Sequence, residues 1–121
     1  MKESAPKRHG LKKDRYSKIR GGNSCFFDIF CSACGNHVIL YQKDGTGRLL
    51  RAYLDRIFAP AIFVGLQGNG KDKKSLPILK CTTCQGNIGI PMVYGPEKRL
   101  AFRLIRGSFS KKNSDGTHPP I

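Results

Sequence analysis

The sequence predicts a small β-rich domain of antiparallel hairpins, with one short inserted helix and disordered basic tails. The apolar residues of the 121-residue chain are concentrated in residues 25–105, where β-branched and aromatic runs alternate with turn signals. A core of about eighty residues is commonly worth only ~3–5 kcal/mol without a metal ion or disulfide bonds. We therefore expect one metal-stabilised or disulfide-bonded domain at residues 24–107.

Both ends of the chain are predicted to be disordered. Residues 1–23 carry eight Lys and Arg against two acidic residues, with few large apolar side chains, and are interpreted as a disordered basic arm. Residues 108–121 contain Lys111, Lys112, an Asp115-Gly116 turn signal and a Pro-Pro pair. They are interpreted as a flexible C-terminal tail.

Two hairpins are expected, each with a pair of cysteines at its tip. Residues 25–30 lead into the first pair, and residues 37–42 lead out of it toward an Asp-Gly turn signal. Residues 76–80 and 88–94 bracket the second pair in the same way. A last strand is predicted at residues 99–106, because apolar residues alternate there.

The inserted helix is predicted at residues 48–58. Apolar residues recur there at the spacing of one helix face: Leu49, Leu50, Tyr53, Leu54, Ile57 and Phe58. Pro60 is a natural stop beyond them, although a strand is an alternative for so short a run. Residues 61–66 favour a short buried strand, and residues 67–75 are expected to form an exposed loop with a lysine-rich tip.

The cellular compartment bears on how the five cysteines are interpreted. The first twenty residues carry several charges and lack the apolar stretch of a secretory signal peptide, so the protein is expected in the cytoplasm. No apolar run approaches the roughly 20 residues needed to cross a bilayer, so no membrane span is expected. Cytosolic thiols are kept reduced, which favours metal binding over disulfide bonds.

Two Cys-x-x-Cys motifs predict a metal site. They are Cys31-Ser-Ala-Cys34 and Cys81-Thr-Thr-Cys84, and Gly and Asn follow closely after each. Two thiolates separated by two residues can face one ion when a tight turn points backbone amides at the sulfurs, and Gly and Asn tolerate the positive φ of such turns. The four cysteines predict one bound zinc ion. Four protein ligands leave no position open for water, so we expect a structural role and no enzyme activity.

This pattern resembles the zinc-ribbon class, in which two rubredoxin-type knuckles at hairpin tips hold one tetrahedral zinc ion. The resemblance covers residues 25–106 and implies a ligand set of Cys31, Cys34, Cys81 and Cys84. It also implies that Gly35 and Gly86 occupy the turn positions of the knuckles. The 46 residues between the two motifs exceed the roughly 15–20 of the common spacing, and we expect them to hold the inserted helix.

Two further potential ligands are not assigned to the metal. Cys25 lies six residues before Cys31 and is interpreted as a small buried apolar residue. His37 is interpreted as a solvated histidine or one that supports a ligand, because four thiols already complete the set. Iron in a rubredoxin-like electron carrier, and a redox-active dithiol, stay open as alternatives.

The charge of the chain predicts a polyanionic partner. Lys and Arg number 22 against 8 Asp and Glu, which gives a net charge of +14. Nucleic acid is the leading partner, and RNA is favoured over DNA because no predicted helix suits a major groove. The candidate contact residues are Lys12, Lys13, Arg15, Lys18, Arg20, Arg48, Arg51, Arg56, Lys71, Lys73, Lys74, Arg99, Arg103 and Arg106.

A different class of function is the main alternative. Runs of charge are often only solvated surface, and the zinc ribbon together with the apolar residues 58–66 would then dock an acidic protein partner as an interaction adapter. The chain is expected to be a monomer. An enzyme is the weakest interpretation, because the sequence shows no nucleophile–base pairing, phosphate-binding loop or pair of carboxylates.

Overall fold

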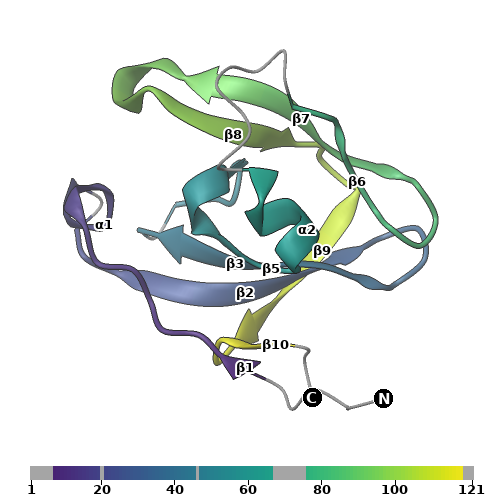
Figure 1. The fold of residues 1–121 in the computed structure, drawn as a ribbon, viewed down its shortest axis with the longest axis horizontal. Helices are drawn as coiled ribbons and strands as arrows, with labels where there is room; N and C mark the ends of the chain where they lie inside the picture. Colours follow the sequence, from purple (N-terminus) through teal and green to yellow (C-terminus); the bar gives the residue numbers. More distant parts are fainter. Residues whose placement is uncertain (1–6, 20, 46, 67–75, 119–121) are drawn as a thin grey trace.

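The computed structural model describes residues 7–19, 21–45, 47–66 and 76–118. Within these residues the chain forms two antiparallel four-stranded sheets and a separate two-stranded ribbon. Figure 1 shows one sheet above and the other below the central part of the chain, which includes the short helix α2 (Ala61–Val64). The β-rich class predicted from the sequence is confirmed.

The first sheet has the order β5-β3-β2-β9, and the second sheet has the order β4-β8-β7-β6. The first consists of β2 (Ser24–Cys31), β3 (His37–Asp44), β5 (Ile57–Ala59) and β9 (Phe109–Ser114). The second consists of β4 (Arg51–Tyr53), β6 (Leu79–Lys80), β7 (Asn87–Tyr94) and β8 (Arg99–Leu104). The ribbon pairs β1 (Lys7–Arg8) with β10 (Thr117–His118).

Both predicted hairpins and the last predicted strand are present. The pairing of β2 with β3 places Phe27 opposite Tyr41 and Ile29 opposite Ile39. The second hairpin pairs β6 with β7, and β7 continues into β8 through a turn in which Lys98 has a φ of +51°. The cysteine motifs therefore lie at two hairpin tips, as the sequence predicts.

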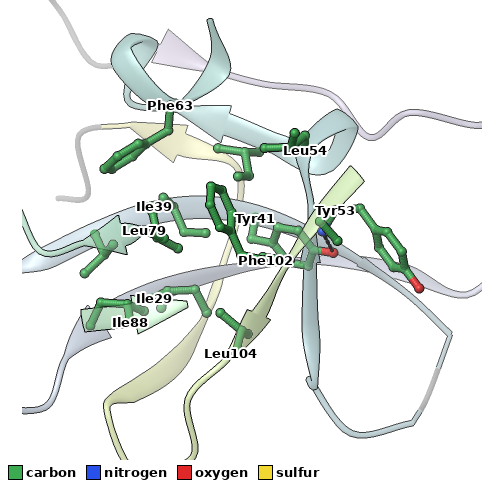
Figure 2. Packing of buried hydrophobic residues seen from close by; sticks show 14 of the residues in the cluster. Ile29, Ile39, Tyr41, Tyr53, Leu54, Phe63, Leu79, Ile88, Phe102 and Leu104 are labelled. Carbon is green, nitrogen blue, oxygen red and sulfur yellow. Dashed lines mark hydrogen bonds between the residues drawn. The ribbon is translucent and has the colours of Figure 1, made fainter. Parts of the chain in front are cut away.

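One hydrophobic core joins the two sheets (Figure 2). Ile29 and Ile39 of the first sheet and Ile88 and Phe102 of the second are each at most 1% exposed. Burying such a side chain is worth about 1.5–3 kcal/mol. Neither hairpin can leave the other without exposing this shared core, so the two hairpins belong to one folding unit.

The predicted helix at residues 48–58 is wrong. The segment forms β4, a single 3₁₀ turn η1 (Leu54–Arg56) and β5, and so crosses from the second sheet to the first. Ala52 pairs with Phe102, and Ala59 pairs with Leu40. Tyr53, Leu54 and Ile57 are buried where the segment passes from one sheet to the other, whereas Leu50 is 55% exposed. Strand pairing at the two sheet edges outweighs the weak helical preference of so short a run.

The short helix lies one segment later, where a strand was predicted. In α2 the amides of Phe63 and Val64 donate to the carbonyl of Pro60, which sits at the N-terminal end of the helix. Proline fixes a backbone angle that suits a helix start. Phe63 is buried whereas Ile62 is 67% exposed, so only one face of this apolar run contacts the core.

The C-terminal segment differs from the predicted flexible tail. Residues 109–114 form β9, which pairs along β2 with Ile29 opposite Lys111 and Phe27 opposite Asn113. The side chains of Ser110, Lys111 and Lys112 are exposed, so the strand adds backbone hydrogen bonds rather than core volume. Its composition therefore looks like that of a tail. The predicted Asp115-Gly116 turn is present, with a φ of +92° at Gly116.

The described part of the N-terminal arm is ordered, contrary to the prediction. Residues 7–8 form β1, and Arg15–Ile19 form the single-turn helix α1, capped by the Asp14 carboxylate. The Lys12 backbone exchanges two hydrogen bonds of 2.7 and 2.8 Å with the buried side chain of Gln42. Polar contacts hold this segment, and these contacts leave no apolar signature in the sequence. None of the described helices is long and apolar enough to cross a membrane.

Candidate metal centre and basic surface

The first cysteine motif forms a tight knuckle at the end of β2. The amide of Gly35 donates to the carbonyl of Cys31 at 2.8 Å, and the amide of Cys31 donates to the carbonyl of Asn36 at 2.9 Å. Gly35 has a φ of +79°, a conformation that glycine adopts without strain. The glycine predicted at this turn position is therefore in its expected place.

The second knuckle repeats this hydrogen bonding with different residues. The amide of Gln85 donates to the carbonyl of Cys81, and the amide of Cys81 donates to the carbonyl of Gly86, both at 2.9 Å. Gln85, with a φ of +66°, is thus the counterpart of Gly35, and the prediction that Gly86 holds this position is wrong. Gly86 corresponds to Asn36, and a Cβ atom there would lie 3.3 Å from the Cys84 sulfur. The glycine leaves room for the thiol.

The four cysteine sulfurs meet at one point between the two knuckles. The Sγ atoms of Cys31 and Cys84 are 3.6 Å apart, those of Cys34 and Cys81 are 3.5 Å apart, and all four lie within 4.8 Å of one another. A disulfide bond requires about 2.05 Å. Four sulfurs about 2.3 Å from a tetrahedral ion are about 3.8 Å apart. The cluster fits one four-coordinate metal ion, and the predicted ligand set comes together as one group.

The two knuckles differ in electrostatic character. The side-chain amide of Asn36 lies 3.3 Å from the Cys34 sulfur, and its hydrogen bond lowers the pKa of this thiol to about 6. The Gly86 amide favours the Cys84 thiolate, but the bonds that Cys84 shares with the other thiols, Cys31 first, raise its pKa to about 11. The Cys34 thiol therefore ionises at a lower pH than the Cys84 thiol. Metal binding displaces the protons of the ligand thiols.

Cys25 and His37 lie outside the cluster. The thiol of Cys25 is exposed near the start of β2, so its interpretation as a buried residue is wrong. The Nε2 atom of His37 is 2.8 Å from the buried carboxylate of Asp28, and its ring meets the edge of Phe30. Asp28 thus holds the His37 ring, and His37 is not among the described residues that form the cluster.

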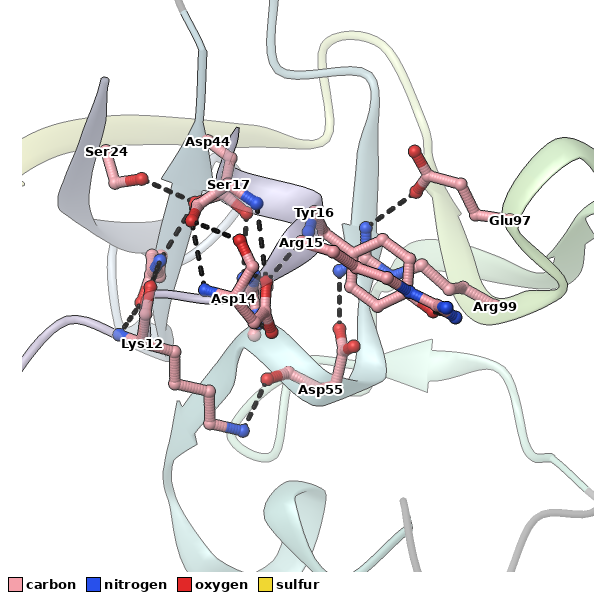
Figure 3. Close-up of polar contacts among 12 residues, drawn as sticks. Lys12, Asp14, Arg15, Tyr16, Ser17, Ser24, Asp44, Asp55, Glu97 and Arg99 are labelled. Carbon is pink, nitrogen blue, oxygen red and sulfur yellow. Dashed lines mark hydrogen bonds and ion pairs between the residues drawn. The ribbon is translucent and has the colours of Figure 1, made fainter. Parts of the chain in front are cut away.

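Arg56, a predicted nucleic-acid contact, is instead buried in the protein. Its side chain is 1% exposed, and it donates to Asp44 at 2.8 Å and to both oxygens of Asp14, at 2.6 and 3.1 Å. Asp14 and Asp44 belong to one polar cluster around α1 (Figure 3). The ion pair with Arg56 lowers the pKa of Asp14 from 3.8 to about 2. The charge of Arg56 is already neutralised and cannot serve a phosphate.

Arg99 is likewise buried rather than available to a ligand. It lies between Asp55 and Glu97 (Figure 3), donating at 2.6 and 2.8 Å, and its side chain is 5% exposed. The guanidinium group is 3.9 Å from the ring centres of both Tyr16 and Tyr53, so it is also held between two aromatic faces. This arginine joins α1, η1 and β8.

The other described candidates lie at the surface. Those that are exposed are Lys12, Lys13, Arg15, Lys18, Arg48, Arg103 and Arg106. Arg51 is half-buried, with its guanidinium group 4.3 Å from the ring centre of Tyr94. Arg20, Lys71, Lys73 and Lys74 lie outside the described residues. The prediction missed Lys111 and Lys112 on β9, because that strand was interpreted as a tail; they lie over the rings of Phe27 and Phe30.

Comparison with models of protein families, with curated proteins and with solved structures finds no match to this chain. Its function is therefore argued from its own residues. They provide a four-cysteine cluster that fits one metal ion and a surface on which basic side chains prevail.

Proposed function

We propose that this protein is a structural-zinc module that binds nucleic acid, and RNA rather than DNA, through its exposed basic surfaces. The observation that carries the proposal is the distribution of charge. Two buried arginines, Arg56 and Arg99, occupy four of the 8 acidic side chains of the chain, which leaves 20 basic side chains against four acids. Half of the acidic side chains are thus paired with these two arginines, while most described lysines and arginines are exposed, where phosphates can bind.

Zinc is proposed because the ligands are four thiolates in a closed arrangement. Zinc prefers tetrahedral sulfur coordination, and a site with four protein ligands keeps no position for substrate. Metal binding would join the tip of the first sheet to the tip of the second. An iron ion in the same site would make the protein red, whereas a zinc protein is colourless.

RNA is favoured by the shapes of the described elements. The two α-helices, α1 and α2, contain five and four residues, too few to fill a major groove of DNA. Arg15 and Lys18 lie on α1, but most of the other exposed basic side chains lie on strands and loops, as in proteins that bind unpaired RNA. Arg103 on β8 and Arg51 on the neighbouring β4 face each other in register on the second sheet.

The experiment that tests this function is a binding titration of the zinc-loaded protein with single-stranded RNA and with duplex DNA over a range of salt concentrations. Each phosphate contact contributes a slope of about −0.7 in log affinity against log salt for single strands, so several contacts predict a steep fall. Binding that does not respond to salt, or no binding, would favour the adapter for an acidic protein.

The contribution of the N-terminal arm to RNA binding is measured with point substitutions rather than with a deletion. Removing residues 1–23 would take Asp14 away from Arg56 and destabilise the domain. The exposed side chains of Lys13 and Lys18 can be replaced by alanine with little effect on folding. We expect this pair of substitutions to weaken RNA binding and to reduce the slope of its salt dependence.

A further inference from the structure

An open groove lies beside the hydrophobic core, and none of the four cysteines of the cluster lines it. It is formed by the beginning of β2, the end of β3, the loop at residues 47–50, the end of β8 and the beginning of β9. Its volume is about 790 Å³, within the usual range for sites that bind small molecules.

Apolar side chains form much of the groove wall. Phe27 and Leu104 belong to the main core, and Leu49 and Phe109 pack against it. Leu50 lines the groove, and 55% of its surface is exposed. The core is thus open on this side, and open apolar surface of this kind is characteristic of a binding site.

Positive charge surrounds this apolar surface. Lys43, Arg48, Arg106 and Lys111 all line the groove, and none of its described lining residues is acidic. Lys111 lies with its amino group 4.3 Å from the ring centre of Phe27. A ligand for the groove must therefore supply negative charge together with an apolar face.

We propose that this groove binds an unpaired nucleotide of an RNA strand, with the base against the apolar wall and the flanking phosphates at Arg48 and Arg106. The inference rests on the proposed function, and it assigns the main contact with RNA to this groove. Bases that are splayed out of a strand bind in this way, with stacking or apolar contact on one side and hydrogen bonds at the base edge.

The polar lining distinguishes a nucleotide from an anionic lipid. Asn23 and Ser110 are exposed at the groove and offer hydrogen-bonding groups that an alkyl chain would leave unsatisfied at a cost. Gly47 and Gly107 also line it, and a Cβ atom at either would meet nothing within 4 Å. The backbone is therefore open to close approach by a phosphate group.

The test uses two pairs of charge-matched variants of the zinc-loaded full chain. Leu50→Asp places a carboxylate in the groove, and Ile62→Asp places one on the exposed face of α2, where the side chain is 67% exposed. Arg48→Ala with Arg106→Ala removes two groove charges, and Lys13→Ala with Lys18→Ala removes two charges elsewhere. Affinity is measured by fluorescence anisotropy with a single-stranded RNA of about ten nucleotides.

We expect each groove variant to bind the RNA at least about tenfold more weakly than its matched control. Leu50→Asp replaces an apolar contact with the base by a carboxylate that repels the phosphates, and the arginine pair removes the two cations that bind the phosphates. Cys25 supplies a second measurement, since its exposed thiol lines the groove. Bound RNA should slow alkylation of Cys25, as located by mass spectrometry, while the same RNA leaves alkylation of Cys25 in Leu50→Asp unchanged.

The outcomes separate the inference from the function on which it rests. RNA binding that falls equally in groove and control variants, with Cys25 unprotected, overturns the groove and leaves the function standing. No RNA binding by the unmodified protein overturns both. Protection of Cys25 by dodecanoate but not by RNA would assign the groove to an anionic amphiphile and also overturn the proposal.

Discussion

Two clusters join distant parts of this chain, and they differ in chemistry and in how they are encoded. The cysteine cluster joins residues that are 53 positions apart, such as Cys31 and Cys84. The arginine cluster joins Arg56 to Asp14 and Arg99 to Asp55, at separations of 42 and 44 positions. One cluster is made of four identical residues in two short motifs, and the other of six charged residues scattered along the chain.

The two clusters contribute to folding in different ways. Four thiols gain most of their stabilising effect only when a metal ion is bound, since the binding free energy becomes folding free energy. Buried ion pairs contribute little net stability, because desolvation offsets their attraction, but removing one partner leaves a buried charge at high cost. A metal ion held by the four thiols would thus make the fold depend on metal, whereas the arginines connect α1, η1 and the two sheets.

The largest expected effect comes from breaking the metal centre. Cys84→Ser should abolish high-affinity zinc binding and remove about 10–16 kcal/mol of metal-dependent stability, more than the core of so small a domain supplies. Circular dichroism should show loss of the cooperative thermal transition. Cys25→Ser is the control, and it should melt as the unmodified protein does because Cys25 lies outside the cluster. A cooperative transition at the original temperature in Cys84→Ser would show that the fold does not need the metal.

The next effect is expected at Arg56. Arg56→Met leaves Asp14 and Asp44 without their partner and should lower the free energy of unfolding in urea by about 3–5 kcal/mol. Adding Asp14→Asn and Asp44→Asn removes the unpaired charges, so the triple variant should recover much of this loss. A single variant within about 1 kcal/mol of the unmodified protein would mean that the cluster behaves like exposed ion pairs.

A smaller effect is expected at Arg99, and β8 itself offers the control. Arg99→Met should cost about 2–3 kcal/mol in the same urea titration, less than Arg56→Met because Arg99 donates two hydrogen bonds to carboxylates whereas Arg56 donates three. Arg103 lies on the same strand but is exposed, so Arg103→Met should change stability by less than about 0.5 kcal/mol. Equal losses in the two variants would contradict a specific role for Arg99.

The smallest effect concerns the pH dependence of the arginine cluster. The pKa of Asp14 is lowered from 3.8 to about 2 by Arg56, so its contribution to stability is complete above pH 3.8 and is lost as the pH falls toward 2. The carboxyl carbon signal of Asp14 in NMR should therefore show no protonation down to pH 3.8 in the folded protein. A titration midpoint at 3.8 or above in the folded state would show that the ion pair with Arg56 is absent in solution.

The cysteine cluster was predictable from the sequence, whereas the arginine cluster was not. The hairpins and the four cysteines were predictable, because strand alternation and the Cys-x-x-Cys motif are local patterns. The burial of Arg56 was not, because its partners come from α1 and β3, and no local pattern marks an arginine that will be buried. Strand β9 was missed for a related reason, since it contributes backbone hydrogen bonds and keeps its lysines in solvent.

The similarity of the two cysteine motifs led to one wrong prediction, at Gly86. Aligning the glycines made Gly86 the counterpart of Gly35, whereas hydrogen bonding makes Gln85 its counterpart. Glycine and glutamine both adopt positive φ here, and only the carbonyl partners of the two amides reveal the correct register. The candidate groove is similarly invisible in the sequence, because its lining comes from five segments that meet only in the fold.

The central claim, that four thiolates of this chain hold one zinc ion, is tested most directly by elemental analysis of the protein purified without added metal. The account predicts one zinc per chain, unchanged in Cys25→Ser and absent in Cys84→Ser, and a colourless protein. Finding no metal while all thiols remain reduced, or finding a red protein with one iron per chain, would contradict it.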